Sequence, residues 1–331
     1  MKNNRAKAIA DGAICSALSA LLMVIYIYVS PLAFLMILVS GAPMAYLAIK
    51  HGLRICIPAM FVSIFALFVL TGDIISALLV GIINLLPGVA VGRALSKRAS
   101  FSVVVLLGSV AVLIGFMVQL VLFNTAGGGE GIKNLIEGSI ESARKIAEPV
   151  IASLAEQNAE QSMTIYSMWN KAMEQVQNRI FTYMPSFLIG ASGVMGYLIY
   201  MSYVFILSRV KRMRVPYLPF KWIRANRMTC DILIIVYIIT LFSDSSSVWM
   251  LAFKNMAALL NAYLAVCGLA LIDFKLGKKI KSGYARSGIY VVFFFVSYMF
   301  IGFIYQILSI VGMIDSLMDF RRMHRAGDNR D

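Results

Sequence analysis

The chain has 331 residues, of which 60% are hydrophobic and only 14% charged, and its mean hydropathy is +0.82. These few charged residues cannot cover the surface of a soluble globular protein of this size. The composition therefore excludes a soluble globular protein and predicts an integral membrane protein. The net charge of +14 comes from basic residues that gather between the apolar blocks. This distribution favours membrane topology and contact with anionic lipid headgroups over nucleic acid as a partner.

Apolar blocks of span length run along most of the chain. Because lipid offers no partner to open backbone groups, such blocks must be helices. The fold class is therefore all-α, a polytopic transmembrane helical bundle with eight or nine spans. In chain order the candidate spans are 9–29, 31–49, 55–71, 74–92, 101–123, 185–207, 228–243, 256–273 and 288–314.

The first block follows a charged head in "MKNNRAKAIADGAICSALSALL". No small-residue cleavage site follows it, so we interpret it as a retained helix. Ala10, Ala13, Ala17 and Ala20 form a stripe of methyl groups along one face. Such a stripe lets another helix approach closely, either inside this bundle or in a separate membrane subunit, and Ala13 and Ala17 are the candidate docking residues.

Prolines lie in or beside the first four blocks, where they are expected to kink helices and free carbonyl groups. They are Pro31, Pro43, Pro58 and Pro87.

The loops at 50–54, 93–98, 209–227 and 275–286 are all basic, which predicts that they and the N-terminus are cytoplasmic in a bacterial plasma membrane. The tail breaks this pattern. Nine alternating crossings would place residues 315–331 outside, although they contain four arginines. The number of spans and the side of the C-terminus therefore stay open at this point.

Residues 124–184 depart from membrane character, since they hold all seven glutamates of the chain and only five basic residues. Apolar side chains recur there at helical spacing in two stretches, around Pro149 and from Met163 to Tyr183. We predict an extracytoplasmic insert of two amphipathic helices. The resulting division is 1–123 (first five spans), 124–184 (insert), 185–314 (remaining spans) and 315–331 (charged tail).

Signatures of catalysis are missing from the sequence: it has no nucleophile elbow, phosphate loop or His-Glu metal motif. We expect no enzyme, no cofactor and no metal site. Amides inside apolar blocks must face the bundle interior, so Asn84, Gln119 and Asn261 are candidate ligand-binding residues. Hydrogen bonding between helices explains them equally well.

The last apolar block ends in "GMIDSLMDFRRMHR", residues 312–325. Asp315 and Asp319 lie one helical turn apart, and Arg322 lies three residues after Asp319 on the same face. The spacing favours a local ion-paired helix end at the membrane surface.

The run "VPYLPFKW", "LLNAYLAVCGLALIDFKL" and "VGMIDSLMDFRR" resembles the YybS-like family of predicted bacterial membrane proteins, a domain of unknown function numbered 2232. The resemblance implies a terminal motif of Gly-x-x-Asp followed by Asp-Phe-Arg. Its positions in this chain are Gly312, Asp315, Asp319, Phe320 and Arg321.

The part before residue 208 is also similar to the substrate-binding components of energy-coupling-factor vitamin transporters. The similarity rests on six blocks, a cytoplasmic N-terminus, Ala13 and Ala17 in the first helix, and a long outer segment before the sixth block. It implies a transporter-like bundle that binds a small molecule from the outer side and depends on partner subunits for energised transport. The alternative is a non-transporting scaffold in envelope assembly, division or sporulation.

Overall fold

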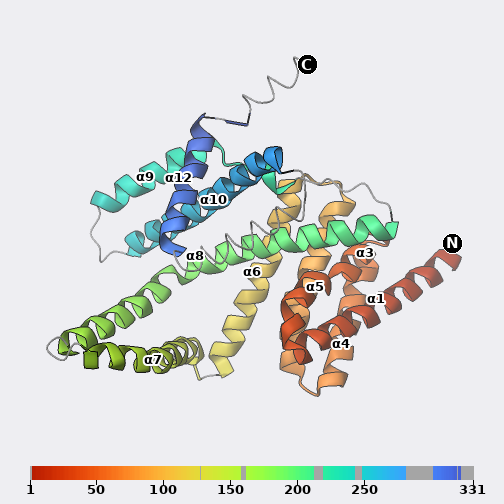
Figure 1. Ribbon diagram of the computed structural model, residues 1–331. Coiled ribbons are helices and arrows are strands. Elements are labelled where there is room, and N and C mark those ends of the chain that lie inside the picture. Colours follow the sequence, from red (N-terminus) through yellow and green to blue (C-terminus); the bar gives the residue numbers. More distant parts are fainter. Residues whose placement is uncertain are drawn as a thin grey trace, which may run out of the picture. The chain divides into compact units, whose positions relative to one another are not determined.

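The computed structural model describes residues 2–126, 128–157, 162–211, 219–242, 248–280, 301–318 and 320–321. Helices account for almost all of these residues, and the described part of the chain contains no strand (Figure 1). Seven helical segments are long and apolar enough to cross a membrane, and a shorter apolar helix covers Ile304–Met318. The prediction of an all-α polytopic bundle is confirmed.

The chain divides into two compact units. The N-terminal unit comprises Met1–Phe181 and Ala191–Pro216, and the C-terminal unit comprises Thr182–Gly190 and Tyr217–Asp331. Each unit has its own apolar core. Helix α8 (Ser162–Lys211) contributes residues to both units.

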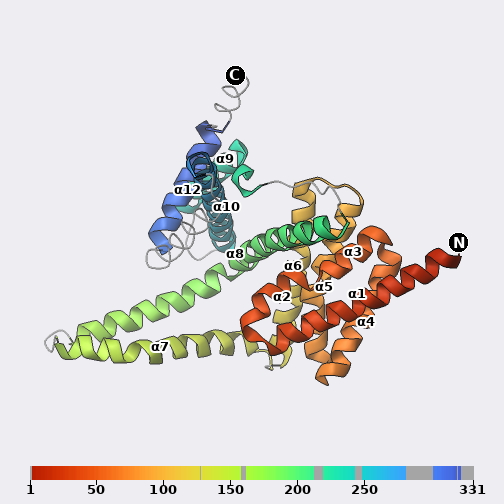
Figure 2. The same cartoon turned by 45° about the vertical axis from the view of Figure 1, so that its right-hand side comes forward.

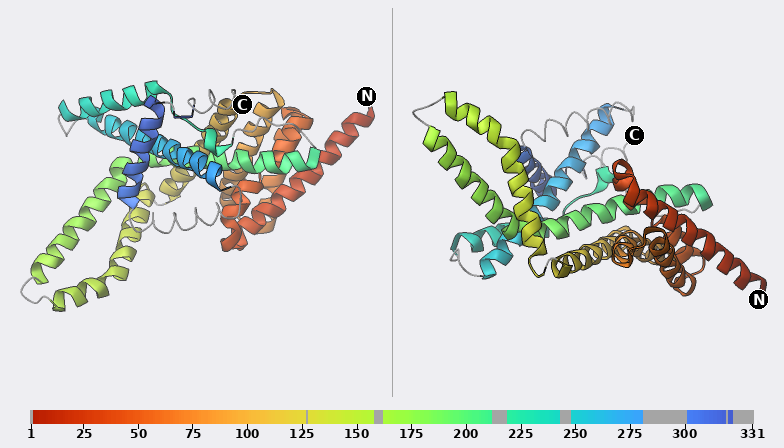
Figure 3. Two further views of the ribbon diagram at one scale, coloured as in Figure 1. Left: turned by 45° about the horizontal axis from the view of Figure 1, so that its top comes forward. Right: turned by 90° about the horizontal axis from the view of Figure 1, so that it is seen from below.

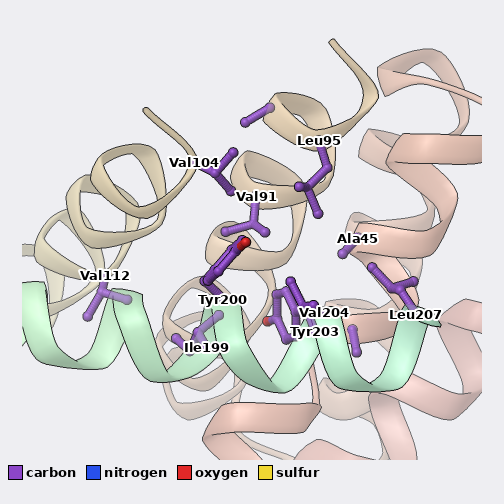
Figure 4. Close-up of a cluster of buried hydrophobic side chains, with 12 residues drawn as sticks. Ala45, Val91, Leu95, Val104, Val112, Ile199, Tyr200, Tyr203, Val204 and Leu207 are labelled. Atoms are coloured by element: carbon purple, nitrogen blue, oxygen red, sulfur yellow. The ribbon is translucent and has the colours of Figure 1, made fainter. Parts of the chain in front are cut away.

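The N-terminal unit contains a bundle of helices, of which α1, α4, α5 and α6 are long enough to cross a membrane and follow the apolar blocks. Helix α1 packs against α4, and α5 packs against α3, α4 and α6. Tyr200 and Tyr203 of α8 project among side chains of α3, α5 and α6 and complete this core (Figure 4). The elements are α1 (Lys2–Tyr28), η1 (Ser30–Leu32), α2 (Ala33–Val39), α3 (Ala42–Lys50), α4 (Leu53–Thr71), α5 (Ile74–Ser96), α6 (Phe101–Ala126), α7 (Gly131–Gln157) and α8 (Ser162–Lys211).

The second predicted span, 31–49, is not one continuous helix. It consists of η1, α2 and α3, with a break at Ser40 and Gly41 between α2 and α3. Pro43 is a physical cause, because it has no N–H and its ring crowds the carbonyl four residues earlier. A break is thus present beside Pro43, at Ser40 and Gly41, whereas Pro58 and Pro87 lie inside the continuous helices α4 and α5.

Helices α7 and the first part of α8 correspond to the predicted amphipathic insert (Figures 1 and 2). Ile136 and Ile140 of α7 pack with Met173 of α8, so the two helices share a small apolar contact. Helix α8 continues for 50 residues and therefore joins the insert to the sixth span without a break at Pro185.

The side chain of Asn255 explains why α8 stays continuous at Pro185. Its Oδ1 accepts a hydrogen bond from the Ser186 N–H (3.0 Å), and its Nδ2 donates to the Thr182 carbonyl (2.8 Å). A proline inside a membrane helix leaves backbone groups that need partners, and a neighbouring helix can supply them. Asn255, which is buried in α10 (Val248–Lys279), therefore bonds to backbone groups on both sides of Pro185.

The C-terminal unit contains η3 (Phe220–Trp222), α9 (Arg227–Phe242), α10 (Val248–Lys279) and α12 (Ile301–Met318), which lie together in Figure 3 (left). Contacts between α10 and α12 advance together along both helices. Tyr305 donates to the Ala258 carbonyl, and further along Ser309 donates to Asn261. The two helices are therefore parallel.

Helix α9 runs antiparallel to this pair, since Tyr237 contacts Asn261 whereas Cys230 contacts Met313 further along. The ends of α10 and α12 therefore lie at the same end of the unit as η3. Nine simple alternating crossings would have separated the ends of α10 and α12, so the structure differs from that version of the prediction.

Candidate functional site

A first buried polar cluster lies at the break between α2 and α3. Ser40 donates from Oγ to Oδ1 of Asn84 (2.7 Å), and Ser19 of α1 donates to the Ser40 carbonyl (3.0 Å). All three side chains are buried. The amide of Asn84 also donates to the Val80 carbonyl within its own helix (2.8 Å). We call Ser19, Ser40, Asn84, Gly41 and Tyr203 the helix-break cluster.

Tyr203 of α8 completes the helix-break cluster. Its side chain is fully buried, and its Oη has no hydrogen-bond partner among the described residues. A Cβ atom on Gly41 would lie 2.1 Å from this oxygen and 2.5 Å from the Asn84 carbonyl oxygen. Only glycine at position 41 therefore lets the tyrosine hydroxyl reach the broken backbone.

The other two candidate ligand-binding amides are not part of this cluster. Gln119 is exposed on α6. Asn261 belongs to the C-terminal unit, where its Nδ2 donates to the Tyr237 hydroxyl and its Oδ1 accepts from Ser309 (3.0 Å). Asn84 and Asn261 thus both bond between helices, as the packing interpretation of these amides expects.

Ala13 and Ala17 are both exposed on α1. The face of α1 that packs inside the bundle is formed instead by residues such as Cys15, Ser16 and Ser19, which are buried. Ala13 and Ala17 therefore do not pack against other helices within the bundle, which was one of the two interpretations of the alanine stripe. Docking of another membrane subunit at these residues stays a prediction.

A polar cluster that the sequence analysis missed joins α1 to the end of α3. The Asp11 carboxylate accepts hydrogen bonds from Lys50 and from Nε2 of His51, the latter at 2.7 Å. Lys50 also donates to the Tyr46 hydroxyl (3.0 Å). Lys50 and His51 had been interpreted only as loop charges, and the long sequence separation from Asp11 left no local signal.

The second buried cluster contains the family motif at the end of α12. Arg321 and Asp315 form an ion pair with Nη2 and Oδ2 3.0 Å apart, and their side chains are only 4% and 1% exposed. Arg321 also donates to the carbonyls of Lys221 (2.6 Å), Ile223 (2.9 Å) and Cys267 (3.2 Å). One guanidinium thus joins η3, α10 and α12, and we call Asp315 and Arg321 the terminal ion pair.

Gly312 lies one turn before Asp315, where the backbones of α12 and α10 are in close contact. A Cβ atom there would lie 1.9 Å from the Leu264 carbonyl oxygen, and one on Gly268 would lie 2.1 Å from the Leu308 carbonyl oxygen. Two glycines facing each other therefore allow backbone contact between the helices. This contact places the terminal ion pair against α10.

The predicted ion pair between Asp319 and Arg322 lies outside the described residues. Asp315 is instead paired with Arg321, which lies three residues after the end of α12 at Met318. Phe320 lies beside Lys275, whose Nζ is 5.5 Å from the ring centroid.

The fold and these clusters define the class: an all-α membrane protein with several apolar helices, in which buried polar side chains such as Asn84 and Ser309 bond between helices. Residues 17–316 match the family described as "Predicted membrane protein (DUF2232)", and the chain belongs to that family. The matched residues include Gly312 and Asp315, whereas Phe320 and Arg321 lie just beyond them. No curated protein and no solved structure matches the chain.

Proposed function

We propose that this protein is a transporter-like component of the bacterial plasma membrane that binds a small molecule in its N-terminal unit, from the outer side. The N-terminus is assigned to the cytoplasm by the charge bias of the loops. The observation that carries the proposal is the Tyr203 hydroxyl, buried beside a broken helix with no hydrogen-bond partner among the described residues.

Energetics support a ligand at the helix-break cluster. A buried hydroxyl without a partner costs about 1–3 kcal/mol, so a group that bonds to it recovers free energy. Broken helices in transporters likewise expose backbone groups without partners inside the helix, and these groups bond to the substrate. Because Ser40 and Asn84 already bond to each other, Tyr203 is the group assigned to the ligand.

Access to this site requires movement, since Tyr203 is fully buried. The break at Ser40 and Gly41 supplies a hinge between α2 and α3. The ligand fitting these surroundings is small and partly apolar, with one hydrogen-bonding group for Tyr203. The proposal follows the similarity to energy-coupling-factor substrate-binding components, assigns no enzymatic role, and places ATP hydrolysis on a partner subunit docked at Ala13 and Ala17.

Thermal unfolding of the purified full chain with vitamins and vitamin precursors tests the proposal. A ligand at 100 times its Kd adds about 2.7 kcal/mol to the free energy of unfolding. Tyr203→Phe removes one neutral hydrogen bond and is expected to weaken binding about tenfold. Tyr166→Phe, at an exposed site on the same helix, is the matched control. A panel without any stabilising compound, or equal responses of Tyr203→Phe and the wild type, would contradict the proposal.

A scaffold in envelope assembly, division or sporulation is the second candidate, and exposed apolar side chains on the amphipathic insert favour it. Ile146 on α7 is 79% exposed and Met163 on α8 is 88% exposed. Apolar residues this exposed outside a membrane are typical of docking surfaces. This candidate predicts that affinity purification recovers envelope-assembly proteins and that Ala13→Leu disrupts the complex without lowering the abundance of the chain.

A further inference from the structure

One end of the C-terminal unit carries lysines held against aromatic rings. Nζ of Lys278 lies 5.1 Å from the ring centroid of Phe274, and Nζ of Lys221 lies 5.8 Å from that of Trp222. The two rings meet edge to face, with centroids 5.4 Å apart. Lys275 lies over Phe320 in the same way, at 5.5 Å. We call this set the lysine–aromatic end: Lys221, Trp222, Phe274, Lys275, Lys278 and Phe320.

The terminal ion pair brings these residues together. Arg321 bonds to the Lys221 and Ile223 carbonyls of the η3 segment and to the Cys267 carbonyl of α10. Three segments that are distant in sequence therefore converge at one end of the unit. The charge of Arg321 is already matched by Asp315, whereas Lys275, Lys278 and Lys279 are exposed and supply positive charge at this end.

The lysine–aromatic end lies where a membrane-spanning helix leaves the lipid. The apolar span Trp249–Lys279 ends in Lys275, Lys278 and Lys279, all exposed, while Trp222 and Phe274 are half-buried. Half-buried aromatic rings and lysines are typical of the headgroup level of a membrane. At that depth the anions within reach of the lysines are lipid phosphates.

We propose that the lysine–aromatic end is a binding site for one anionic phospholipid, whose phosphodiester lies between Lys275, Lys278 and Lys221 and whose acyl chains lie beside α10 and α12. The rings hold the ammonium groups in place, which reduces the ordering that binding requires. A zwitterionic headgroup carries its own cation close to the phosphate and is therefore bound less well. This site is independent of the ligand proposed for the N-terminal unit.

Retention of phosphatidylglycerol and phosphatidylcholine by the full chain in neutral detergent, counted by native mass spectrometry, tests this proposal. Each lysine near a membrane surface contributes about fivefold to anionic lipid affinity, so Lys275→Gln with Lys278→Gln is expected to weaken phosphatidylglycerol binding about thirtyfold. Lys133→Gln with Lys171→Gln removes the same charge from exposed positions on α7 and α8 and is expected to change nothing.

The double variant Lys275→Arg with Lys278→Arg keeps both charges and is expected to retain phosphatidylglycerol. Retention by this variant shows that substitution at these two positions does not by itself unfold the site. Equal retention of both lipids by the wild type would overturn the proposal, as would wild-type binding by the glutamine variant. Displacement of phosphatidylglycerol by an equal concentration of inorganic phosphate would also overturn it, because the site would then recognise a free anion.

Discussion

Replacing Arg321 by methionine is expected to destabilise the C-terminal unit by about 3–5 kcal/mol, because the substitution leaves the carboxylate of Asp315 buried without its counter-ion. Asp315 is only 1% exposed, so water cannot take over that role. The same change removes the donor that three backbone carbonyls share.

Asp315→Asn is expected to cost less, about 1.5–3 kcal/mol, because it removes a charge-assisted bond but leaves Arg321 its carbonyl acceptors. The combination of Asp315→Leu and Arg321→Met removes both charges. It is therefore expected to be more stable than Arg321→Met alone, since no buried charge then lacks a partner.

Thermal unfolding in detergent and abundance in membranes measure this series. Arg179→Met, at an exposed position on α8, is the control and is expected to change stability by no more than about 0.5 kcal/mol. Strictly additive effects of the two substitutions would refute the pairing. If Asp315→Asn left membrane insertion and abundance untouched yet abolished activity, a structural role for the pair would also be wrong.

Three further substitutions probe features of the fold. Asn255→Ala leaves backbone groups on either side of Pro185 without partners and is expected to destabilise the protein by about 1–3 kcal/mol in thermal unfolding. Gly312→Ala places a methyl group against the Leu264 carbonyl and is expected to cost about 1–3 kcal/mol, whereas Gly193→Ala has open space and is expected to be neutral or stabilising. The Ser76 hydroxyl and the Ile75 N–H lower the pKa of Asp73 at the start of α5. This stabilisation is complete above the ordinary pKa and is lost as pH falls through the lower folded-state pKa, so the effect of Asp73→Ala on the unfolding temperature should shrink in acid.

Hydropathy predicted the membrane-spanning segments because each helix must satisfy its own backbone in lipid, whatever its neighbours are. The limits of α4, α5 and α6 accordingly follow the apolar blocks closely. The helix through Pro185 could not be predicted in this way. Its continuity depends on Asn255, 70 residues later in the chain, which replaces the hydrogen bonds that proline prevents.

The amides and the alanine stripe show a similar limit. Sequence reasoning placed Asn84 in the interior correctly, since an amide in lipid must find a partner. It could not identify that partner as Ser40, because the contact arises only where α2 and α3 break against α5. Nor could a repeat of small residues indicate which side of α1 faces its own bundle, and Ala13 and Ala17 face away.

The partner of Asp315 was missed for a geometric reason. On a continuous helix, the side chains of residues six apart point about 120° apart, so Arg321 is not an obvious partner and spacing favoured Asp319 with Arg322. Helix α12 ends at Met318, and the chain beyond it brings Arg321 back over Asp315. The end of the helix, and not its period, determines this contact.

The parallel arrangement of α10 and α12 also changes how the charge of the C-terminal unit is interpreted. A tail placed opposite the basic loops would contradict the charge bias of the rest of the chain. Because Arg321 bonds to the η3 segment and to α10, the end of α12 lies with Lys221 and Lys275 at one end of the unit. Within the C-terminal unit, the end of the last helix and the basic residues Lys221 and Lys275 therefore satisfy the same charge rule. The terminal ion pair also gathers the lysines proposed to bind lipid.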